Sequence, residues 1–428
     1  MLAVHLHARL GTAAPPFAGR YRIRVGAASL LAPMVAAIVV WGTARGIADR
    51  LPWRRLLLAG YLSAAAWALG LALVDGGRGL AGPVTDPGSF LADSRLVRGN
   101  PLGYLRGFVA SAPLHTPDAR EHPPGPGLLL WALGWIGVHR PVLIGLLITL
   151  VGCLAVPFVA IAVRSLCHET AARRLVPLLA LAPYALWVAV SMDAVTLAIG
   201  AGMVACGVLG SERGRRPWWA VGCGLLLGLD ALFSYSAPWL GFTVVVVYFV
   251  RRRPLLNVVT GVMALVPLSL ARAAGFIWPD GLRAAQAELA VRVGPHRSWL
   301  VWTFLDLLVL AVATGPAIAA GARKLRRTPG WPFLVGTTLA VGLAIGSGLS
   351  RGDVERSWLV FYPWLLVPAV AAERRAVAAA ASGPDPSGAA RPAAPAADPA
   401  PAAEPPVLLL GLGALAAIVL EAILRSPW

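Results

Sequence analysis

The sequence is poor in charge, since only 13% of its 428 residues are Asp, Glu, Lys or Arg. A soluble domain of ordinary composition carries about a quarter charged residues. The missing charge is replaced by apolar side chains, which make up 58% of the chain and give a mean hydropathy of +0.72. These values exclude an ordinary soluble domain and favour an integral membrane protein.

Cysteine is also scarce, and no CxxC pair occurs, so neither a disulfide framework nor a zinc or redox site is predicted. Several cofactor and metal signatures are incomplete. His168-Glu169 lacks the second histidine of a metal-binding HExxH helix. Gly411-Leu-Gly413 lacks the third glycine of a dinucleotide loop. No cleavable signal-peptide pattern opens the chain. The four cysteines are Cys153, Cys167, Cys206 and Cys223.

Acidic residues are outnumbered, with 20 Asp and Glu against 37 Lys and Arg, for a formal charge of +17. A basic excess is typical of nucleic-acid binding and also of the cytoplasmic loops of membrane proteins. The second interpretation fits better, because the arginines cluster between apolar blocks, and no nucleic-acid partner is expected. The clusters are Arg45/Arg50/Arg54/Arg55, Arg164/Arg173/Arg174, Arg213/Arg215/Arg216, Arg251/Arg252/Arg253, Arg323/Lys324/Arg326/Arg327 and Arg374/Arg375.

Long apolar blocks fill most of the chain between these clusters. Blocks of about 17 to 25 apolar residues cross a bilayer as helices, because lipid offers no partners for backbone polar groups. We therefore predict an all-α, polytopic transmembrane helix bundle with about 11–13 spans. A shorter block at 126–138 is expected to be re-entrant or interfacial. The twelve blocks are 25–46, 55–74, 141–163, 175–190, 194–210, 218–232, 235–250, 255–277, 300–321, 332–350, 357–372 and 407–424.

This set of spans places all six basic clusters on one face, which is predicted to be cytoplasmic. Most of the acidic loop residues then fall on the opposite, external face. The N-terminus would also lie outside although it carries Arg20, Arg22 and Arg24, so whether the first block spans stays open. The predicted location is the plasma membrane, with the chemistry on its non-cytoplasmic side.

The same pattern divides the chain into four parts. Residues 1–24 form an N-terminal tail, and residues 25–375 form the transmembrane core. Within the core, residues 75–125 form a long external loop with an amphipathic helix near 102–112. Residues 376–406 are almost only Ala and Pro and are predicted to be a disordered linker. Residues 407–428 add a last transmembrane helix, expected at the periphery.

Three external segments carry candidate chemistry. The first loop contains Asp86-Pro-Gly-Ser-Phe-Leu-Ala-Asp93, which places two carboxylates seven residues apart at the membrane surface. It ends in Arg120-Glu121-His122-Pro123-Pro124-Gly125, where the prolines stiffen the turn into a short apolar helix. A late segment reads Asp353-Val-Glu355-Arg356-Ser-Trp-Leu-Val-Phe-Tyr-Pro363-Trp364.

The order and sidedness of these segments resemble the GT-C-type glycosyltransferases, in the branch that uses polyprenyl-phosphate sugars. The late segment is similar to a Glu-Arg-x-Trp-Leu-x-Phe-x-Pro segment of actinobacterial lipoglycan glycosyltransferases. The likeness covers most of residues 50–375. The chain departs from the family in having two apolar blocks before Asp86 and in lacking an adjacent Asp-Asp or Asp-Glu pair.

The resemblance implies an inverting glycosyltransferase with a polyprenyl-phosphate-linked sugar donor and an acceptor hydroxyl on an envelope glycan, lipid or protein. Asp86 is the first candidate for the base and Asp93 the second. Candidates for binding the donor phosphate or substrate are His122, Arg356, Glu355, Arg297 and Asp193.

Each of these residues also has a structural interpretation. Asp86 and Asp93 could be solvated loop acids, and His122 could stiffen its turn. Arg356 could pair with Glu355 to lock a helix end. Asp193 could cap a helix. Arg272 and Arg292 are weaker phosphate candidates, and Asp230 and Asp306 are noted because ionisable groups in spans are costly.

Two other functions stand beside the enzyme. About twelve spans also suit a secondary transporter or a flippase for lipid-linked sugars, although the long asymmetric first loop and the few mid-bilayer charges disfavour it. The third hypothesis is that the chain is a non-enzymatic protein that assists assembly of the cell envelope. The sequence leaves open the sugar, the acceptor and the use of a divalent metal.

Overall fold

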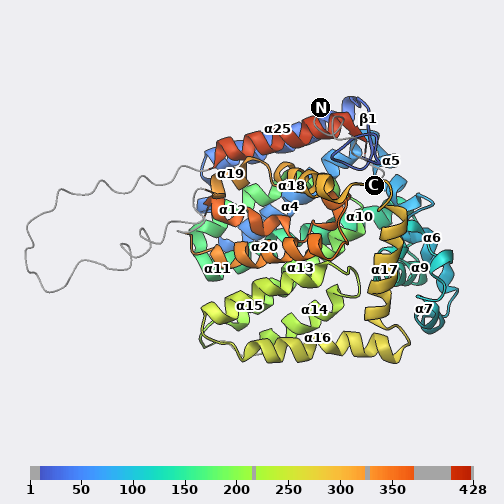
Figure 1. Cartoon of the computed structure of the whole chain (residues 1–428). Helices are drawn as coiled ribbons and strands as arrows, with labels where there is room; N and C mark the ends of the chain where they lie inside the picture. Colours follow the sequence, from blue (N-terminus) through green and yellow to red (C-terminus); the bar gives the residue numbers. More distant parts are fainter. Residues whose placement is uncertain (1–9, 215–217, 323–327, 371–405, 426–428) are drawn as a thin grey trace, which may run out of the picture.

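The computed structural model describes residues 10–214, 218–322, 328–370 and 406–425, and these are almost entirely helical (Figure 1). The predicted all-α membrane bundle is confirmed. The first nine residues lie outside the described residues. The predicted linker 376–406 also lies outside them, except for residue 406. The principal helices are α2 (Leu31–Ala44), α4 (Trp53–Ala72), α10 (Pro141–Cys153), α11 (Ala155–Cys167), α12 (Glu169–Ala180), α13 (Met192–Gly210), α14 (Trp218–Asp230), α15 (Gly241–Val250), α16 (Leu256–Ala273), α17 (Trp278–Arg292), α18 (Trp299–Thr314), α19 (Pro316–Ala322), α20 (Trp331–Gly346) and α25 (Val407–Ile423).

Among the residues that the structure describes, five helical stretches are long and apolar enough to cross a membrane. They are Ala27–Ala44, Trp53–Asp75, Pro141–Cys167, Met192–Gly210 and Leu256–Ala273. Five shorter apolar helices accompany them: Trp218–Asp230, Ala237–Val250, Trp299–Thr314, Trp331–Gly346 and Val407–Ile423. Ten of the twelve predicted blocks coincide with these helices, and the chain is a multi-pass membrane protein.

The predicted span at 175–190 is not one helix. Helix α12 ends at Ala180, and a 3-10 turn, η5, covers Pro183–Trp187 before α13 begins at Met192. Pro183 has no backbone N–H and opens the turn. Val190 then adopts φ +68°, which is rare for a β-branched residue. The run is apolar because it is buried in protein, and burial alone does not distinguish a span from a turn.

The predicted span at 357–372 is also broken into short turns. These are α21 (Val354–Ser357), α22 (Tyr362–Leu365) and α23 (Val367–Val370), with Pro363 and Pro368 interrupting the backbone ladder. Trp358, Phe361 and Trp364 are fully buried. Non-helical backbone is tolerated at the depth of the hydrocarbon core when protein, not lipid, surrounds it. This segment therefore forms part of the core of the bundle.

The long loop at 75–125 is folded into short helices at one end of the bundle, where α5, α6, α7, α9 and α17 gather (Figure 1). They are α5 (Gly77–Thr85), α6 (Phe90–Ser94), α7 (Pro101–Gly107), α8 (Pro117–Arg120) and α9 (Gly125–Trp135). The predicted amphipathic helix is shorter than expected, because α7 ends at Gly107. The block at 126–138 forms the short helix α9, and its re-entrant or interfacial position stays a prediction.

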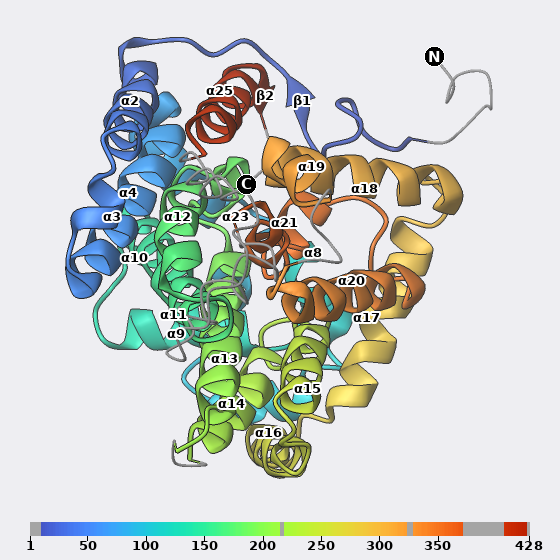
Figure 2. The same ribbon diagram turned by 90° about the vertical axis from the view of Figure 1, so that its left-hand side faces the viewer.

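The two ends of the described chain meet. Strand β1 (Arg20–Tyr21) pairs antiparallel with β2 (Leu424–Arg425), which follows α25. Figure 2 shows α25 lying between α2 and α19. The C-terminal helix therefore packs on the bundle, and its last residues reach the same end of the molecule as α5 (Figure 1).

Candidate functional site

Arg356 is the centre of a buried charge cluster at this end of the bundle. The side chain comes from α21, and only 6% of the residue is exposed. Its Nη2 lies 3.2 Å from Asp118 Oδ1, and its Nε lies 3.3 Å from Asp193 Oδ2. Burial acts to lower the pKa of Arg356, but the neighbouring carboxylates, Asp118 first, outweigh it and raise that pKa. The residue therefore remains a cation.

Asp193 and His122 extend the cluster. Ser191 is the N-cap of α13, and its Oγ accepts the Asp193 N–H. The Asp193 carboxylate thus does not cap the helix and instead lies between Arg356 and His122, with Oδ1 3.6 Å from His122 Nε2. His122 Nδ1 donates to the Asp118 carbonyl oxygen at 2.8 Å, which turns Nε2 toward Asp193.

Asp118 is a member of the cluster that the sequence did not single out. It lies in α8, whose N-cap Thr116 and first residue Pro117 form a helix-start signal. That signal predicts where the helix begins but not which way the carboxylate points. The contact with Arg356 joins residues 238 positions apart and could not be read from local sequence.

Glu355 lies next to Arg356 but faces another way. Its Oε1 accepts the Ala18 N–H at 2.9 Å, and the residue is fully buried. Burial and, secondly, the nearby Asp353 raise the pKa of Glu355 to about 8. The expected Arg356–Glu355 lock is therefore replaced by contacts to other chain segments.

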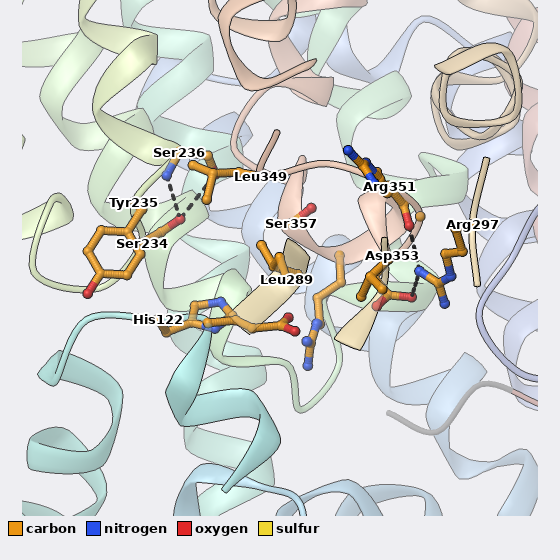
Figure 3. A pocket seen from close by; sticks show the side chains of 14 residues that line it. His122, Ser234, Tyr235, Ser236, Leu289, Arg297, Leu349, Arg351, Asp353 and Ser357 are labelled. Carbon is orange, nitrogen blue, oxygen red and sulfur yellow. Dashed lines mark hydrogen bonds and ion pairs between the residues drawn. The ribbon is translucent and has the colours of Figure 1, made fainter. Parts of the chain in front are cut away.

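A pocket of about 50 Å³ adjoins the cluster. Figure 3 shows His122 on one wall and Arg297, Arg351 and Asp353 on the other. Arg297 Nη1 lies 3.5 Å from Asp353 Oδ1 and donates to the Arg351 carbonyl oxygen at 2.6 Å. Hydroxyl groups line the remaining side, from Ser234, Tyr235, Ser236 and Ser357.

Asp93 lies in a separate, fully buried network inside the loop. Its carboxylate accepts from Tyr104 Oη at 2.5 Å and contacts His115 Nδ1 at 2.7 Å. The Thr116 N–H is 3.3 Å from Asp93 Oδ1. Burial, with the Asp93 charge beside it, raises the pKa of Tyr104, so the phenol stays a donor. These contacts hold the fold of the loop together.

Asp86, in contrast, is exposed and lines a polar cavity of about 280 Å³. It follows the last residue of α5, and its Oδ1 accepts the Gly88 N–H at 2.8 Å. The Gly88 carbonyl oxygen accepts the Asp118 N–H at 3.3 Å, so a short stretch of backbone joins Asp86 to the Arg356 cluster. Asp93 is also joined to α8, through the Thr116 N–H, so what distinguishes Asp86 is that its carboxylate is exposed to the cavity.

A narrow apolar pocket of about 40 Å³ lies between the two larger spaces. It shares Arg356 with the first pocket and Pro83 with the Asp86 cavity. Its walls include Phe90, Leu130 and Ile148. Within the described ranges, no group of three or more His, Cys, Asp or Glu side chains is arranged to hold a metal ion.

No family model matches the chain, and no curated protein matches it. Two solved structures are similar to it, both of ArnT from Cupriavidus metallidurans. One is described as bound to undecaprenyl phosphate, with 17% identity, a TM-score of 0.48, and coverage of 74% of this chain and 59% of that one. The other is the apo state, with 18% identity, a TM-score of 0.47, and coverage of 74% and 58%. The chain thus spans somewhat less than three fifths of those proteins.

Proposed function

We propose that the chain is a membrane glycosyltransferase that moves a sugar from a polyprenyl-phosphate donor to an acceptor hydroxyl on the non-cytoplasmic face. The observation that carries this proposal is the buried Arg356 cluster, which faces a pocket rich in arginine at one end of an apolar helix bundle. The phosphate of a lipid lies at the membrane surface, so a protein that binds it needs cations at the end of its membrane helices. The arginines of this pocket lie at such an end.

The pocket beside Arg356 suits the phosphate leaving group. It contains three arginines, Arg297, Arg351 and Arg356, against the two acids Glu121 and Asp353. Guanidinium groups bind phosphate oxygens through paired hydrogen bonds. Cations fixed before the reaction also stabilise the charge that develops on a departing phosphate. His122 lines the opposite wall, with Nε2 turned toward Asp193.

Asp86 is the proposed base. Its carboxylate is exposed to a cavity, whereas both oxygens of Asp93 are already engaged by Tyr104, His115 and the Thr116 N–H. Asp86 takes the proton from the acceptor hydroxyl as that oxygen forms its bond to the anomeric carbon. The bond from that carbon to the phosphate oxygen breaks, and polyprenyl phosphate leaves with the electron pair. Attack opposite the leaving group inverts the anomeric centre.

The external location of the site rests on the distribution of arginine. The basic clusters around 45–55, 164–174 and 251–253 lie at the ends of spans that face away from α5 and α9 by the predicted topology. The role in envelope glycan or lipoglycan synthesis follows from this location and from the resemblance of the late Glu355-Arg356 segment.

The test uses the purified full chain in lipid nanodiscs, supplied with polyprenyl-phosphate mannose or arabinofuranose and a crude envelope-lipid acceptor fraction. Asp86→Asn is expected to reduce transfer by about 10²- to 10⁴-fold, the usual contribution of a general base. Asp280→Asn is the control, because Asp280 is an exposed acid paired with Arg283 on the surface. Full activity of Asp86→Asn would assign the base elsewhere. Donor sugar that crosses sealed vesicles without any transfer would favour a flippase.

A further inference from the structure

The cavity that contains Asp86 is built by both ends of the chain. Its volume, about 280 Å³, exceeds that of the pocket beside Arg356, about 50 Å³. Three structural parts contribute charged walls: the N-terminal segment, the α5 region, and the end of α25. The charged lining residues are Arg24, Asp75, Arg78, Asp86, Glu421 and Arg425.

Arg24 joins these three parts. Its Nη1 lies 2.6 Å from Asp75 Oδ2, and its Nη2 lies 2.8 Å from Glu421 Oε1. Nη2 also donates to the carbonyl oxygens of Glu421 and Leu424. The guanidinium therefore holds β1, the residues before α5 and β2 in one arrangement. These contacts keep Glu421 beside the α5 region, on the wall of the cavity that contains Asp86.

Three charged groups of the lining remain available to a ligand. Arg78, Asp86 and Arg425 are exposed, and within the described residues none of them takes part in an ion pair. The cavity is formally neutral, with three arginines and three acids. A phosphate dianion would meet three carboxylates here, and an acyl or prenyl chain would meet charged walls. A polyhydroxylated group finds both hydrogen-bond donors and acceptors.

We propose that this cavity is the acceptor site and that it binds a carbohydrate, with Arg78 and Arg425 as specificity-determining contacts and Arg24 as the positioning residue. The assignment as acceptor site rests on the proposed glycosyltransferase function; the binding of a carbohydrate does not. One sugar hydroxyl lies against Asp86, which takes its proton as the new glycosidic bond forms and the donor phosphate leaves. The other hydroxyls accept from the two arginines and fix the sugar's orientation.

Carbohydrate binding can be measured without any enzymatic activity. Gly82 lines the cavity, and a Cβ added there meets nothing within 4 Å. Gly82→Cys therefore places a thiol in the cavity without a clash. Gly77→Cys is the matched control, because Gly77 belongs to the same helix, is exposed, has the same free space and does not line the cavity. The native cysteines are buried or half-buried, which limits background labelling.

The purified full chain is labelled with a charged thiol reagent in the presence of octyl mannoside, octyl arabinofuranoside or octyl phosphate. We expect a glycoside to slow labelling of Gly82→Cys several-fold and to leave Gly77→Cys unchanged, while octyl phosphate protects neither. Protection by octyl phosphate as strong as by the glycosides would overturn the carbohydrate assignment. Absence of protection by either glycoside would overturn it as well.

A kinetic test distinguishes whether the cavity binds the acceptor or the donor. Arg78→Gln and Arg425→Gln are each expected to raise KM for the acceptor by about ten- to a hundredfold, the range for losing a hydrogen bond to a charged group. KM for the donor should not change. Arg283→Gln is the control, because it removes a surface arginine whose side chain is 74% exposed. A rise in donor KM instead would assign the cavity to the donor. Protection of Gly82→Cys in a chain that transfers no sugar would refute the enzyme and keep the binding site.

Discussion

At the scale of single residues, Arg356 is held by two carboxylates from separate parts of the chain, Asp118 and Asp193. Removing it leaves buried negative charge without a partner. We expect Arg356→Gln to lower the free energy of unfolding by about 3–5 kcal/mol, the cost of breaking a buried pair. Arg283→Gln should cost about 0–1 kcal/mol, because the Arg283–Asp280 pair lies on the surface. Thermal unfolding in nanodiscs measures both, and equal losses would contradict a special role for Arg356.

Glu355 makes stability depend on pH. Its pKa is 4.5 in the unfolded reference and about 8 in the fold. Between these values the folded state holds a proton that the unfolded state has lost, so stability is greatest below pH 4.5 and falls as pH rises toward 8. The slope from this group is at most about 1.4 kcal/mol per pH unit.

We therefore expect Glu355→Gln to flatten the decline of the unfolding temperature between about pH 5 and pH 8, since glutamine stays neutral and still accepts the Ala18 N–H. The unfolding temperature of both proteins is measured across this range. Parallel curves for the two proteins would show that another group causes the dependence.

Sequence reasoning reached part of the charge cluster and missed the rest for a physical reason. Asp193 and Arg356 could be proposed because each lies at a predicted external span boundary, and His122 because it stands in the Pro-rich turn that ends the external loop. The difference between Asp86 and Asp93 depends on tertiary contacts from Tyr104 and His115, which residue type and spacing do not encode. Asp118 looked like any other loop acid for the same reason.

At the scale of helices and strands, long apolar helices were predictable and broken ones were not. The pattern of apolar residues reports burial, and lipid and protein interior give the same pattern. The segments at 175–190 and 357–372 are buried in the bundle, and Pro183, Pro363 and Pro368 interrupt them. Prolines are also tolerated inside membrane helices. For this reason proline positions alone did not decide between a span and a set of turns.

The pairing of β1 with β2 is expected to depend on Arg24. Arg24→Gln removes the charge that bridges Asp75 and Glu421. Hydrogen exchange at the amides of residues 22 and 24, which donate to α25 carbonyl groups, should become faster. Arg22→Gln is the matched control, because the Arg22 side chain is exposed and one residue from β1. Similar exchange in both variants would show that the backbone pairing alone holds the ends together.

At the scale of the whole molecule, the distribution of charge predicts one orientation in the membrane. Gly77→Cys, near Asp86, should react with a membrane-impermeant thiol reagent in intact cells. Arg50→Cys, at the exposed end of the short helix α3 (Ile47–Arg50) between α2 and α4, should react only after the membrane is permeabilised. Mass spectrometry of the labelled protein measures both. Labelling of Arg50→Cys in intact cells would reverse the orientation or show that the first block does not span.

The meeting of the chain ends has a consequence for biosynthesis. Arg24 and Glu421 are separated by 397 residues. At ribosomal rates of about 5–20 residues per second, Glu421 is therefore synthesised about 20–80 s after Arg24. During that time α5 can fold, but the wall formed by Glu421 and Arg425 has not yet been translated. The Asp86 cavity is therefore completed only when α25 has been inserted, and nascent chains in the membrane lack an assembled site until then.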